Sequence, residues 1–187
     1  MTGRHSLDAR TVLLVALALL SAGCIGSSGD PTATPTPSPT PATASPTPTA
    51  VHPTYAQTTF TVVDDESGEE LGRVEAAIAD NYSLRKTGLS ETDRLPADRG
   101  MLFVYDEPQA ELKYVMRNMS FPLDIVFVHG DGTIQSIHHV RAPEAGEDGE
   151  SITASGEGQY VLEVNRGWTT DRGIEAGDRL EFELPDE

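Results

Sequence analysis

The stretch LDIVFVHGDGTIQSIHHV, residues 123–140, decides the fold of this chain. Its two halves, residues 123–128 and 133–140, are rich in β-branched and aromatic side chains, and Asp131-Gly132 lies between them. Asp-Gly tolerates the positive φ angles that both central positions of a type I′ turn require. The pattern therefore predicts an antiparallel β-hairpin with a two-residue loop.

Such a loop fixes which side chains face one another across the hairpin. Counting outward from the loop pairs Val128 with Gln135. Continuing the count pairs Asp124 with His139, and residues directly opposite share a face at about 5 Å between Cβ atoms. A four-residue loop would instead place Ile137 opposite Asp124, and the sequence alone leaves this alternative open.

Six further segments carry strand signals. They are rich in β-branched or aromatic residues, or alternate strictly, and Gly, Pro, Asn or Asp bound them. They are residues 57–63, 71–79, 101–105, 112–116, 159–164 and 179–184. The first two are expected to form a hairpin, with a helix as the alternative for the alanine-bearing second one. The pattern predicts a mainly β fold, a small antiparallel barrel or sandwich of about seven or eight short strands with one or two short helices.

Two connecting regions have signatures of their own. Asn81 is expected to cap a short helix that continues through Leu89, because its side chain can accept from the free N–H groups of a first helical turn. Residues 141–158 are acidic and rich in Gly, which predicts a long surface loop.

Charge and cysteine content exclude several function classes. The 187 residues carry 30 Asp and Glu against 13 Lys and Arg, a formal charge of −17. Nucleic acid is not expected as a partner, because phosphate binding needs clustered basic residues. A single Cys excludes a disulfide framework and a Cys-rich zinc site. Adjacent His138 and His139 on one strand would face opposite sides, so no metal or cofactor is expected.

The distribution of charge is typical of a halophilic protein. Lys86 and Lys113 are the only lysines of the chain, while acidic residues recur from Asp64 to Glu187. Multimolar salt shortens the screening length to about 3 Å, so that a dense carboxylate surface repels itself little. We therefore expect a fold that is more stable in multimolar salt than in dilute buffer. The alternative is an acidic protein from a low-salt organism.

The first 23 residues have the features of a signal peptide. Arg4 and Arg10 precede an apolar run over residues 11–20, and small residues then lead to Cys24, the only thiol. As a helix, such a run spans about 15 Å, half of a bilayer core of roughly 30 Å. The pattern predicts a signal peptide over 1–23 and a lipid on Cys24. An uncleaved anchor or a freely secreted protein is the alternative, and the Sec and twin-arginine export routes both stay open.

Composition divides the rest of the chain into two parts. Residues 24–56 combine the lipidated Cys with a stretch rich in Pro, Thr and Ser that cannot build a core. Such a stretch favours extended, semi-rigid conformers and predicts a tether. Residues 57–187 are then a single globular β-rich domain. We expect the protein to be located on the outer, extracytoplasmic face of the cell membrane, to which the lipid would attach it.

Several ordered motifs resemble one known family. They are RGMLFVY at 99–105, VMRNM at 115–119, FPLDIVF at 121–127, Gly130-Asp131-Gly132, Gly88-Leu89, YVLEV at 160–164, Gly173-Ile174 and Gly177-Asp178. Together they resemble the domain-of-unknown-function 192 family over roughly residues 77–184. The resemblance implies a small mixed domain dominated by β-structure, often exported or membrane-attached. It implies no agreed activity and supplies no catalytic residue.

Asp124 is the strongest candidate for a functional residue in the sequence. It interrupts the apolar run 123–127, and a charged group on a buried strand needs a partner, as does nearby Arg117. With His139 and Asn118 these residues form a candidate polar site, which either binds a ligand or fixes a turn. We favour a non-enzymatic module that binds an envelope protein, a glycan or a small ligand outside the cell. The alternative is an enzyme or accessory factor that acts on envelope polymers through Asp124, His139 and Arg117.

Two sequons are candidate N-glycosylation sites on an exported chain. They begin at Asn81 and Asn118. Asn81 is expected at an exposed turn, whereas Asn118 lies within the central motif, so glycan is expected at Asn81 first. The alternative role for Asn81 is that of a helix cap.

Overall fold

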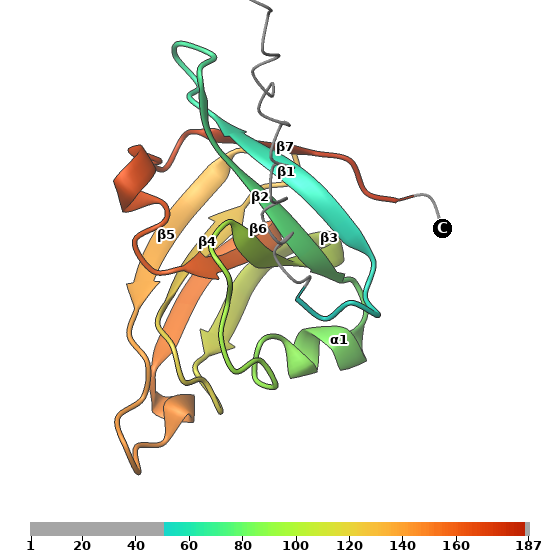
Figure 1. The fold of residues 1–187 in the computed structure, drawn as a ribbon. Helices are drawn as coiled ribbons and strands as arrows, with labels where there is room; N and C mark the ends of the chain where they lie inside the picture. Colours follow the sequence, from blue (N-terminus) through green and yellow to red (C-terminus); the bar gives the residue numbers. More distant parts are fainter. Residues whose placement is uncertain (1–50, 186–187) are drawn as a thin grey trace, which may run out of the picture. The chain divides into compact units, whose positions relative to one another are not determined.

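The computed structural model describes residues 51–185, which form one seven-stranded sheet curled into a half-barrel (Figure 1). Neighbouring strands follow the order β5-β4-β6-β3-β2-β1-β7. The strands are β1 (Gln57–Val63), β2 (Glu70–Ala79), β3 (Arg99–Val115), β4 (Leu123–Val128), β5 (Ile134–Val140), β6 (Thr153–Asn165) and β7 (Arg179–Phe182). One helix, α1 (Tyr82–Thr87), and two 3₁₀ turns, η1 (Gly149–Ser151) and η2 (Thr170–Arg172), complete the described residues. The mainly β class with minor helix is confirmed.

The predicted N-terminal features lie largely outside the described residues. These are the signal peptide, Cys24 and the tether up to residue 50. Residues 51–56, which composition assigns to the tether, pack against the domain: Val51 is buried and Tyr55 contacts the core. Within residues 51–185, no helix is long and apolar enough to cross a bilayer.

The sheet is mixed, whereas the sequence predicts an antiparallel one. Five of the six neighbouring strand pairs are antiparallel, but β2 and β3 run parallel. Parallel neighbours need a crossover connection. Residues 80–98 supply it and include α1. The predicted cap is present, because the Asn81 side chain accepts from the Leu84 N–H at 3.1 Å.

Two segments predicted as separate strands are one long strand. Residues 101–105 and 112–115 belong to β3, with register shifts against β6 between Val104 and Leu112, and the predicted segment extends one residue beyond the strand. The partner β6 begins at Thr153, so the surface loop predicted over 141–158 is shorter than expected. Glycine was the misleading signal, because a Cβ at Gly156 would lie 2.5 Å from the Phe127 ring. Glycine there permits close packing and does not mark a loop.

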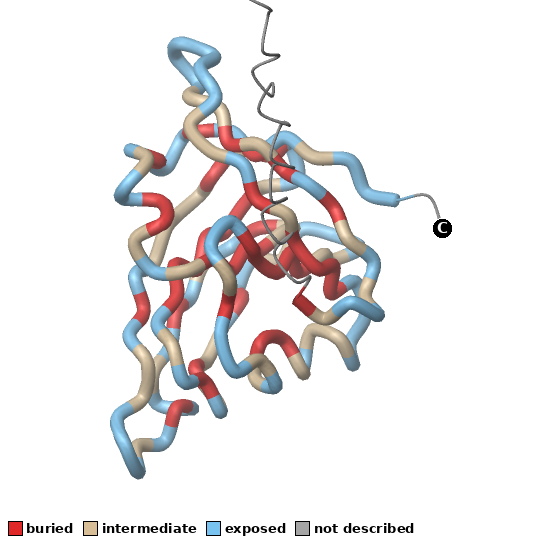
Figure 2. Tube along the Cα trace, viewed as in Figure 1, coloured by how far each residue is buried: buried red, intermediate tan, exposed pale blue. Residues whose placement is uncertain are grey.

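Side chains from the strands build a core on each face of the curled sheet. Alternation sends Ile125 and Phe127 of β4 into one cluster and Val126 of the same strand into the other. On β6, Val161 belongs to the first cluster and Leu162 to the second. Figure 2 shows the buried residues concentrated in the strands, while the connecting loops are exposed. The first core lies on the side of the sheet that α1 covers, since Leu84 packs against it.

The β4–β5 hairpin places Asp124 opposite His139, which confirms the predicted register at this pair. The loop differs from the prediction, because it has three residues. The His129 N–H donates to the Thr133 carbonyl at 2.9 Å, and the Gly132 N–H donates to the His129 carbonyl at 3.0 Å. This is the common loop in which a residue with positive φ follows a type I turn.

A β-bulge compensates for the extra loop residue. Val128 lies opposite Ile134, so the predicted pairing of Val128 with Gln135 is wrong. One step along, Phe127 lies opposite Ser136, which leaves Gln135 as the additional residue of β5. The two deviations cancel, and every pair beyond the bulge has the register that a two-residue loop would give.

The two edge strands meet at one end of the half-barrel. The Ile134 N–H donates to the Asp178 carbonyl at 2.8 Å, and the Leu180 N–H donates to the Gly132 carbonyl at 2.8 Å. Thr133 and Arg179 also form an isolated antiparallel bridge. The hairpin loop of β4–β5 therefore ties the β5 edge to β7, and this contact satisfies edge groups that would otherwise be free to pair with another chain.

Gly132 should tolerate no side chain. Its φ is +89°, and a Cβ there would lie 2.6 Å from the Leu180 carbonyl oxygen. Gly146 is a matched control, since its φ of +84° is similar but nothing lies within 4 Å of its Cβ position. We expect Gly146→Ala to lower the free energy of unfolding by about 1–2 kcal/mol through φ alone, and Gly132→Ala by clearly more. Equal losses in denaturant unfolding would show that the edge contact is loose.

Candidate functional site

Asp124 is fully buried and its carboxylate accepts four hydrogen bonds. Oδ1 accepts from Nδ1 of His139 at 2.6 Å. Oδ2 accepts from the Gly167 N–H at 3.1 Å, from the Thr169 N–H at 3.1 Å and from the Thr169 hydroxyl at 2.7 Å. These donors come from β5 and from the turn after β6, so the carboxylate joins the hairpin to that turn.

This arrangement favours the turn-fixing role of Asp124 over a ligand-binding one. Two backbone N–H groups, a hydroxyl and an imidazole use the acceptor capacity of the carboxylate. The His139 side chain, 43% exposed, covers it from the solvent side. The carboxylate thus has little capacity left for a substrate or a ligand.

The other two members of the predicted polar site lie elsewhere. The Arg117 guanidinium donates to Glu150 Oε1 at 3.0 Å and to the Lys86 carbonyl at 3.0 Å. Asn118 is exposed with φ +56° and lines a hollow against the loop after β5. The structure therefore brings Asp124 and His139 together but joins neither of them to Arg117 or Asn118 by a hydrogen bond within residues 51–185.

A pocket of about 430 Å³ lies between α1 and the first-core face of the sheet. Residues of α1, β3 and β6 line it, together with Arg117 and Met119. Its volume is in the range of small-molecule sites, roughly 300–1,000 Å³. Strand alternation explains why Asp124 is absent from the lining: its neighbour Leu123 faces the pocket side, and Asp124 faces the other.

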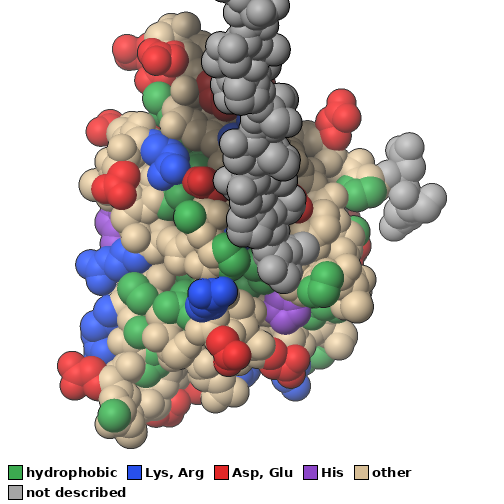
Figure 3. All heavy atoms as spheres, in the orientation of Figure 1, with side chains coloured by type: hydrophobic (Ala, Val, Ile, Leu, Met, Phe, Trp, Pro, Cys, Tyr) green, Lys and Arg blue, Asp and Glu red, His purple; other side chains and the backbone are tan. Residues whose placement is uncertain are grey.

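Basic side chains gather around this pocket. Both lysines of the chain, Lys86 and Lys113, line it with Arg85 and Arg117. Acidic side chains are spread over the face of the domain seen in Figure 3, yet Glu163 is the one acidic residue of the pocket lining. In a chain of net charge −17, this concentration of cations makes the pocket a local site for negative charge.

The pocket arginines are partly engaged, and the lysines are not. Arg85 lies 4.7 Å over the ring of Tyr105 and donates to the Asp80 and Val104 carbonyls at 2.6 and 2.8 Å. Arg117 holds Glu150 in an ion pair. Across the described residues, the ammonium groups of Lys86 and Lys113 have no hydrogen-bond or ion-pair partner. They are the charges most available to a ligand.

Glu163 is buried and lines the pocket without a partner. It is 6% exposed, and its carboxyl group makes no hydrogen bond or ion pair in the described part of the chain. Burial raises its pKa from the ordinary 4.5 to about 8, since desolvation penalises the charged form. Near neutral pH this group is mostly protonated, so it can donate as well as accept a hydrogen bond.

Aromatic side chains form the wall beside Glu163. The hydroxyl groups of Tyr105 and Tyr114 lie 3.1 Å apart, and Tyr114 packs edge-on against Phe103 at 4.9 Å between ring centroids. Burial, with Tyr105 as the next cause, raises the pKa of Tyr114 well above its ordinary value. The wall therefore combines apolar ring surface with hydroxyl groups that can form hydrogen bonds.

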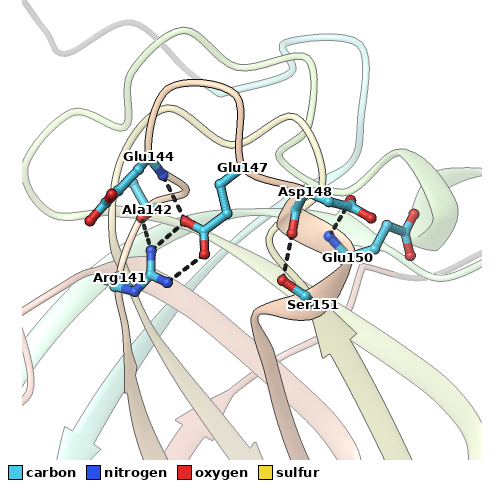
Figure 4. Close-up of polar contacts among 7 residues, drawn as sticks. All are labelled: Arg141, Ala142, Glu144, Glu147, Asp148, Glu150 and Ser151. Atoms are coloured by element: carbon cyan, nitrogen blue, oxygen red, sulfur yellow. Dashed lines mark hydrogen bonds and ion pairs between the residues drawn. The ribbon is translucent and has the colours of Figure 1, made fainter.

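The acidic loop after β5 is ordered by ion pairing (Figure 4). Arg141 makes a two-pronged contact with Glu147, with N···O distances of 2.7 and 2.6 Å, and Glu147 also accepts from the Glu144 N–H at 2.9 Å. These contacts lower the pKa of Glu147 to about 2, with the Arg141 hydrogen bond as the largest cause. Asp148 caps η1 by accepting from the Glu150 N–H at 2.9 Å.

Burial does not separate the two sequons. Asn81 and Asn118 are both exposed, so the preference for Asn81 stays a prediction. The Asn81 side chain is also the helix cap described above, and a glycan there would have to coexist with that contact.

Over residues 51–185, no group of three or more His, Cys, Asp or Glu side chains could hold a metal ion.

The sequence pointed to Asp124 and missed the pocket. Asp124 stands out because it interrupts an apolar run. Glu163 interrupts the apolar run YVLEV at 160–164 in the same way, so it carried a usable signal as well. The scarcity of lysine was the second usable signal. Only the fold shows that Lys86 of α1 and Lys113 of β3 line the same cavity.

Comparisons with known proteins agree with this geometry of a curled β-domain. The model of the uncharacterised family DUF192 matches residues 62–182, and the chain belongs to this family. The match begins earlier than the motif resemblance, so it includes all of β2 and the last two residues of β1. No curated protein matches the chain.

Two solved structures resemble the chain over most of its described part. One, from Sinorhizobium meliloti 1021, is provisionally named a transcription regulator; it has 31% identity and a TM-score of 0.60, covering 68% of this chain and 95% of that one. The other is a protein of unknown function from Novosphingobium aromaticivorans DSM 12444, with 28% identity and a TM-score of 0.58, covering 71% and 91%. The fold therefore recurs in bacterial proteins.

Replacing the buried carboxylate should be costly. We expect Asp124→Asn to lower the free energy of unfolding by roughly 3–5 kcal/mol, because the amide NH₂ would face donors that now share a carboxylate. His139→Ala should cost only about 1 kcal/mol, since the imidazole is partly exposed and water can replace it on the carboxylate. Denaturant unfolding in one buffer checks both variants. A loss for Asp124→Asn no larger than that for His139→Ala would contradict the turn-fixing role.

Glu163 should make stability fall as pH rises. Its pKa in the folded protein, about 8, lies above the ordinary 4.5, so the folded state holds the proton more tightly between these values. The free energy of unfolding should then decrease with pH in this window, by up to ~1.4 kcal/mol per pH unit from this group. Glu163→Gln should remove that slope. Parallel slopes for parent and variant in pH-dependent unfolding would rule out a protonated Glu163.

Proposed function

We propose that this protein is a lipid-anchored module on the outer face of the cell membrane that binds a small ligand in the pocket beside α1. One observation carries the binding role: a pocket of ligand size brings together basic side chains, tyrosines and the buried, unpartnered Glu163. Polar groups that converge on a cavity with aromatic and aliphatic walls are typical of binding sites. An envelope glycan is the expected source of such a ligand.

An enzyme acting on envelope polymers has less support. That alternative used Asp124, His139 and Arg117 together, but the hydrogen bonds of Asp124 go to β5 and the turn after β6. Arg117 faces Glu150 instead. A catalytic carboxylate also needs a free lone pair for the reacting group, and the four donors on Asp124 leave it little room.

The anchor rests on the N-terminal sequence. A short apolar run over residues 11–20, small residues and then Cys24 support export and lipid attachment. The Pro-rich stretch that follows supports a spacer between membrane and domain. The name of the Sinorhizobium relative would suggest DNA as a partner, but a net charge of −17 argues against nucleic acid.

Removing the thiol tests the anchor. We expect Cys24→Ser to move the protein from the membrane fraction to the medium, or to leave an unprocessed precursor, because no other residue can accept the lipid. Fractionation and intact mass of the full chain check this. A mature protein retained on the membrane as well as the parent would overturn lipid anchoring through Cys24.

A mixed set of probes tests the binding role. The full chain, extracted in detergent, is screened by ligand-observed NMR against small neutral, cationic and anionic sugars and organic acids. Binding of at least one class should be weakened by substitutions around the pocket and unchanged by Arg94→Gln, since Arg94 is exposed and outside the pocket lining. Binding that no pocket substitution affects, or no binding at all, would overturn the proposed function.

A further inference from the structure

The side chains that line the pocket specify a ligand class, and this inference rests on the binding role proposed above. We propose that the pocket binds a small, singly charged organic acid that also carries a ring and hydroxyl groups, the chemistry of a uronic acid. The anionic group would lie between the ammonium groups of Lys86 and Lys113. The ring would lie against the tyrosines, with a hydroxyl group at Glu163.

The charge of the lining selects an anion. Four basic residues surround one acidic residue that is buried, so the cations are not neutralised from within the pocket. Lys86 and Lys113 come from different elements, α1 and β3, and neither has an ion-pair partner among residues 51–185. Both lysines are exposed at the rim of the cavity, so each ammonium group adds a modest attraction to a bound anion, which dissolved salt weakens.

The state of the arginines favours a carboxylate over a phosphate. Tight phosphate sites commonly use a free guanidinium fork that makes two parallel hydrogen bonds. Arg117 already binds Glu150 and the Lys86 carbonyl. Arg85 lies on the Tyr105 ring, with one terminal nitrogen used by two carbonyl groups. The charges that remain available are the two lysine ammonium groups, which match a ligand with one negative charge, such as a carboxylate.

Glu163 gives the pocket a neutral polar group at its buried side. The residue is more than nine-tenths buried, it lines the cavity, and its carboxyl group lacks a partner in the described chain. A ligand hydroxyl group can both accept from and donate to a protonated carboxyl group. A buried polar group left without a partner is costly, so a ligand that pairs with it gains affinity over one that cannot.

The aromatic wall and its hydroxyl groups favour a polar ring. Tyr105 and Tyr114 line one side of the pocket, with their hydroxyl groups 3.1 Å apart, and Tyr82 of α1, 74% exposed, lies at the mouth. Tyrosine combines an apolar face with a hydrogen-bonding tip. A hydroxylated ring uses both properties, whereas a bare aromatic acid uses only the face.

Binding should also depend on the proton of Glu163. Its pKa of about 8 means that a second negative charge appears beside the ligand as pH rises above that value. The titratable groups that face it are the tyrosines of α1 and β3, Arg85, both pocket lysines and Arg117. Glu163→Gln keeps all of those groups and replaces the titratable carboxyl group with an amide that stays uncharged. The difference in pH dependence between parent and variant therefore reports on Glu163 alone.

Titration calorimetry of the full chain in detergent tests the proposal, with four probes: D-glucuronate, D-glucose, benzoate and inorganic phosphate. All are measured in one buffer of moderate ionic strength, because multimolar salt would screen the exposed lysines. We expect D-glucuronate to bind at least about tenfold more tightly than each of the other three. Lys86→Gln with Lys113→Gln should weaken it about tenfold or more, and Arg94→Gln should leave it unchanged. Above pH about 8 the affinity of the parent should fall by up to about tenfold per pH unit, while Glu163→Gln binds with little pH dependence.

Each contrary result overturns a defined part. D-Glucose binding as tightly as D-glucuronate would overturn the anion preference and leave the binding role standing. Benzoate or phosphate binding equally well would overturn the sugar acid as the class. An unchanged affinity in the lysine double variant would place the ligand elsewhere. Absence of binding by all four probes would overturn the ligand class, while the broader screen decides separately whether the pocket binds anything.

Discussion

A single buried carboxylate holds the curled sheet in shape. Asp124 of β4 receives His139 of β5 on one oxygen and the turn over residues 167–169 on the other. A carboxylate taken out of water without such partners would cost several kcal/mol, as order-of-magnitude values for buried ions indicate. If the turn moved away from β4, the buried carboxylate would lose three of its four donors, and the fold would lose that free energy. Through that turn the constraint reaches Trp168, which is buried in the second core.

The two buried acids of the sheet illustrate opposite solutions to one problem. Asp124 lies on the second-core side, where hydrogen-bond donors satisfy it. Glu163 lies on the first-core side, and its pKa of about 8 means that a proton removes its charge near neutral pH. The first solution leaves no capacity for another molecule, and the second leaves a hydrogen-bonding group facing a cavity. Strand alternation alone decides which acid receives which environment.

Much of the fold could be predicted from the sequence, because local patterns carried it. Period-two alternation and turn residues located most strands, and the Asn81 cap and the pairing of Asp124 with His139 followed from the same local rules. The parallel β2–β3 pair could not be predicted in this way, since it depends on how a crossover docks in three dimensions. The bulge at Gln135 was equally hidden, because a bulge and a longer loop cancel in the register.

The candidate site was harder to predict than the fold. Asp124 stands out in the sequence because it interrupts an apolar run, yet a charge on a buried strand can serve a structural contact as well as a ligand site. Glu163 has the same sequence signal, and its difference from Asp124 lies in what surrounds it in space. The Arg117 guanidinium contacts Glu150 and the Lys86 carbonyl, and it makes no hydrogen bond to Asp124.

The placement of Lys86 and Lys113 gives the protein an unusual chemical property. They carry the only side-chain amines of the chain, and both are exposed at the mouth of the same pocket. An amine-reactive dye, cross-linker or surface would therefore attach to the domain at this one place. Coupling chemistry that gives a random orientation with most proteins would here give a defined one, with the pocket itself covered.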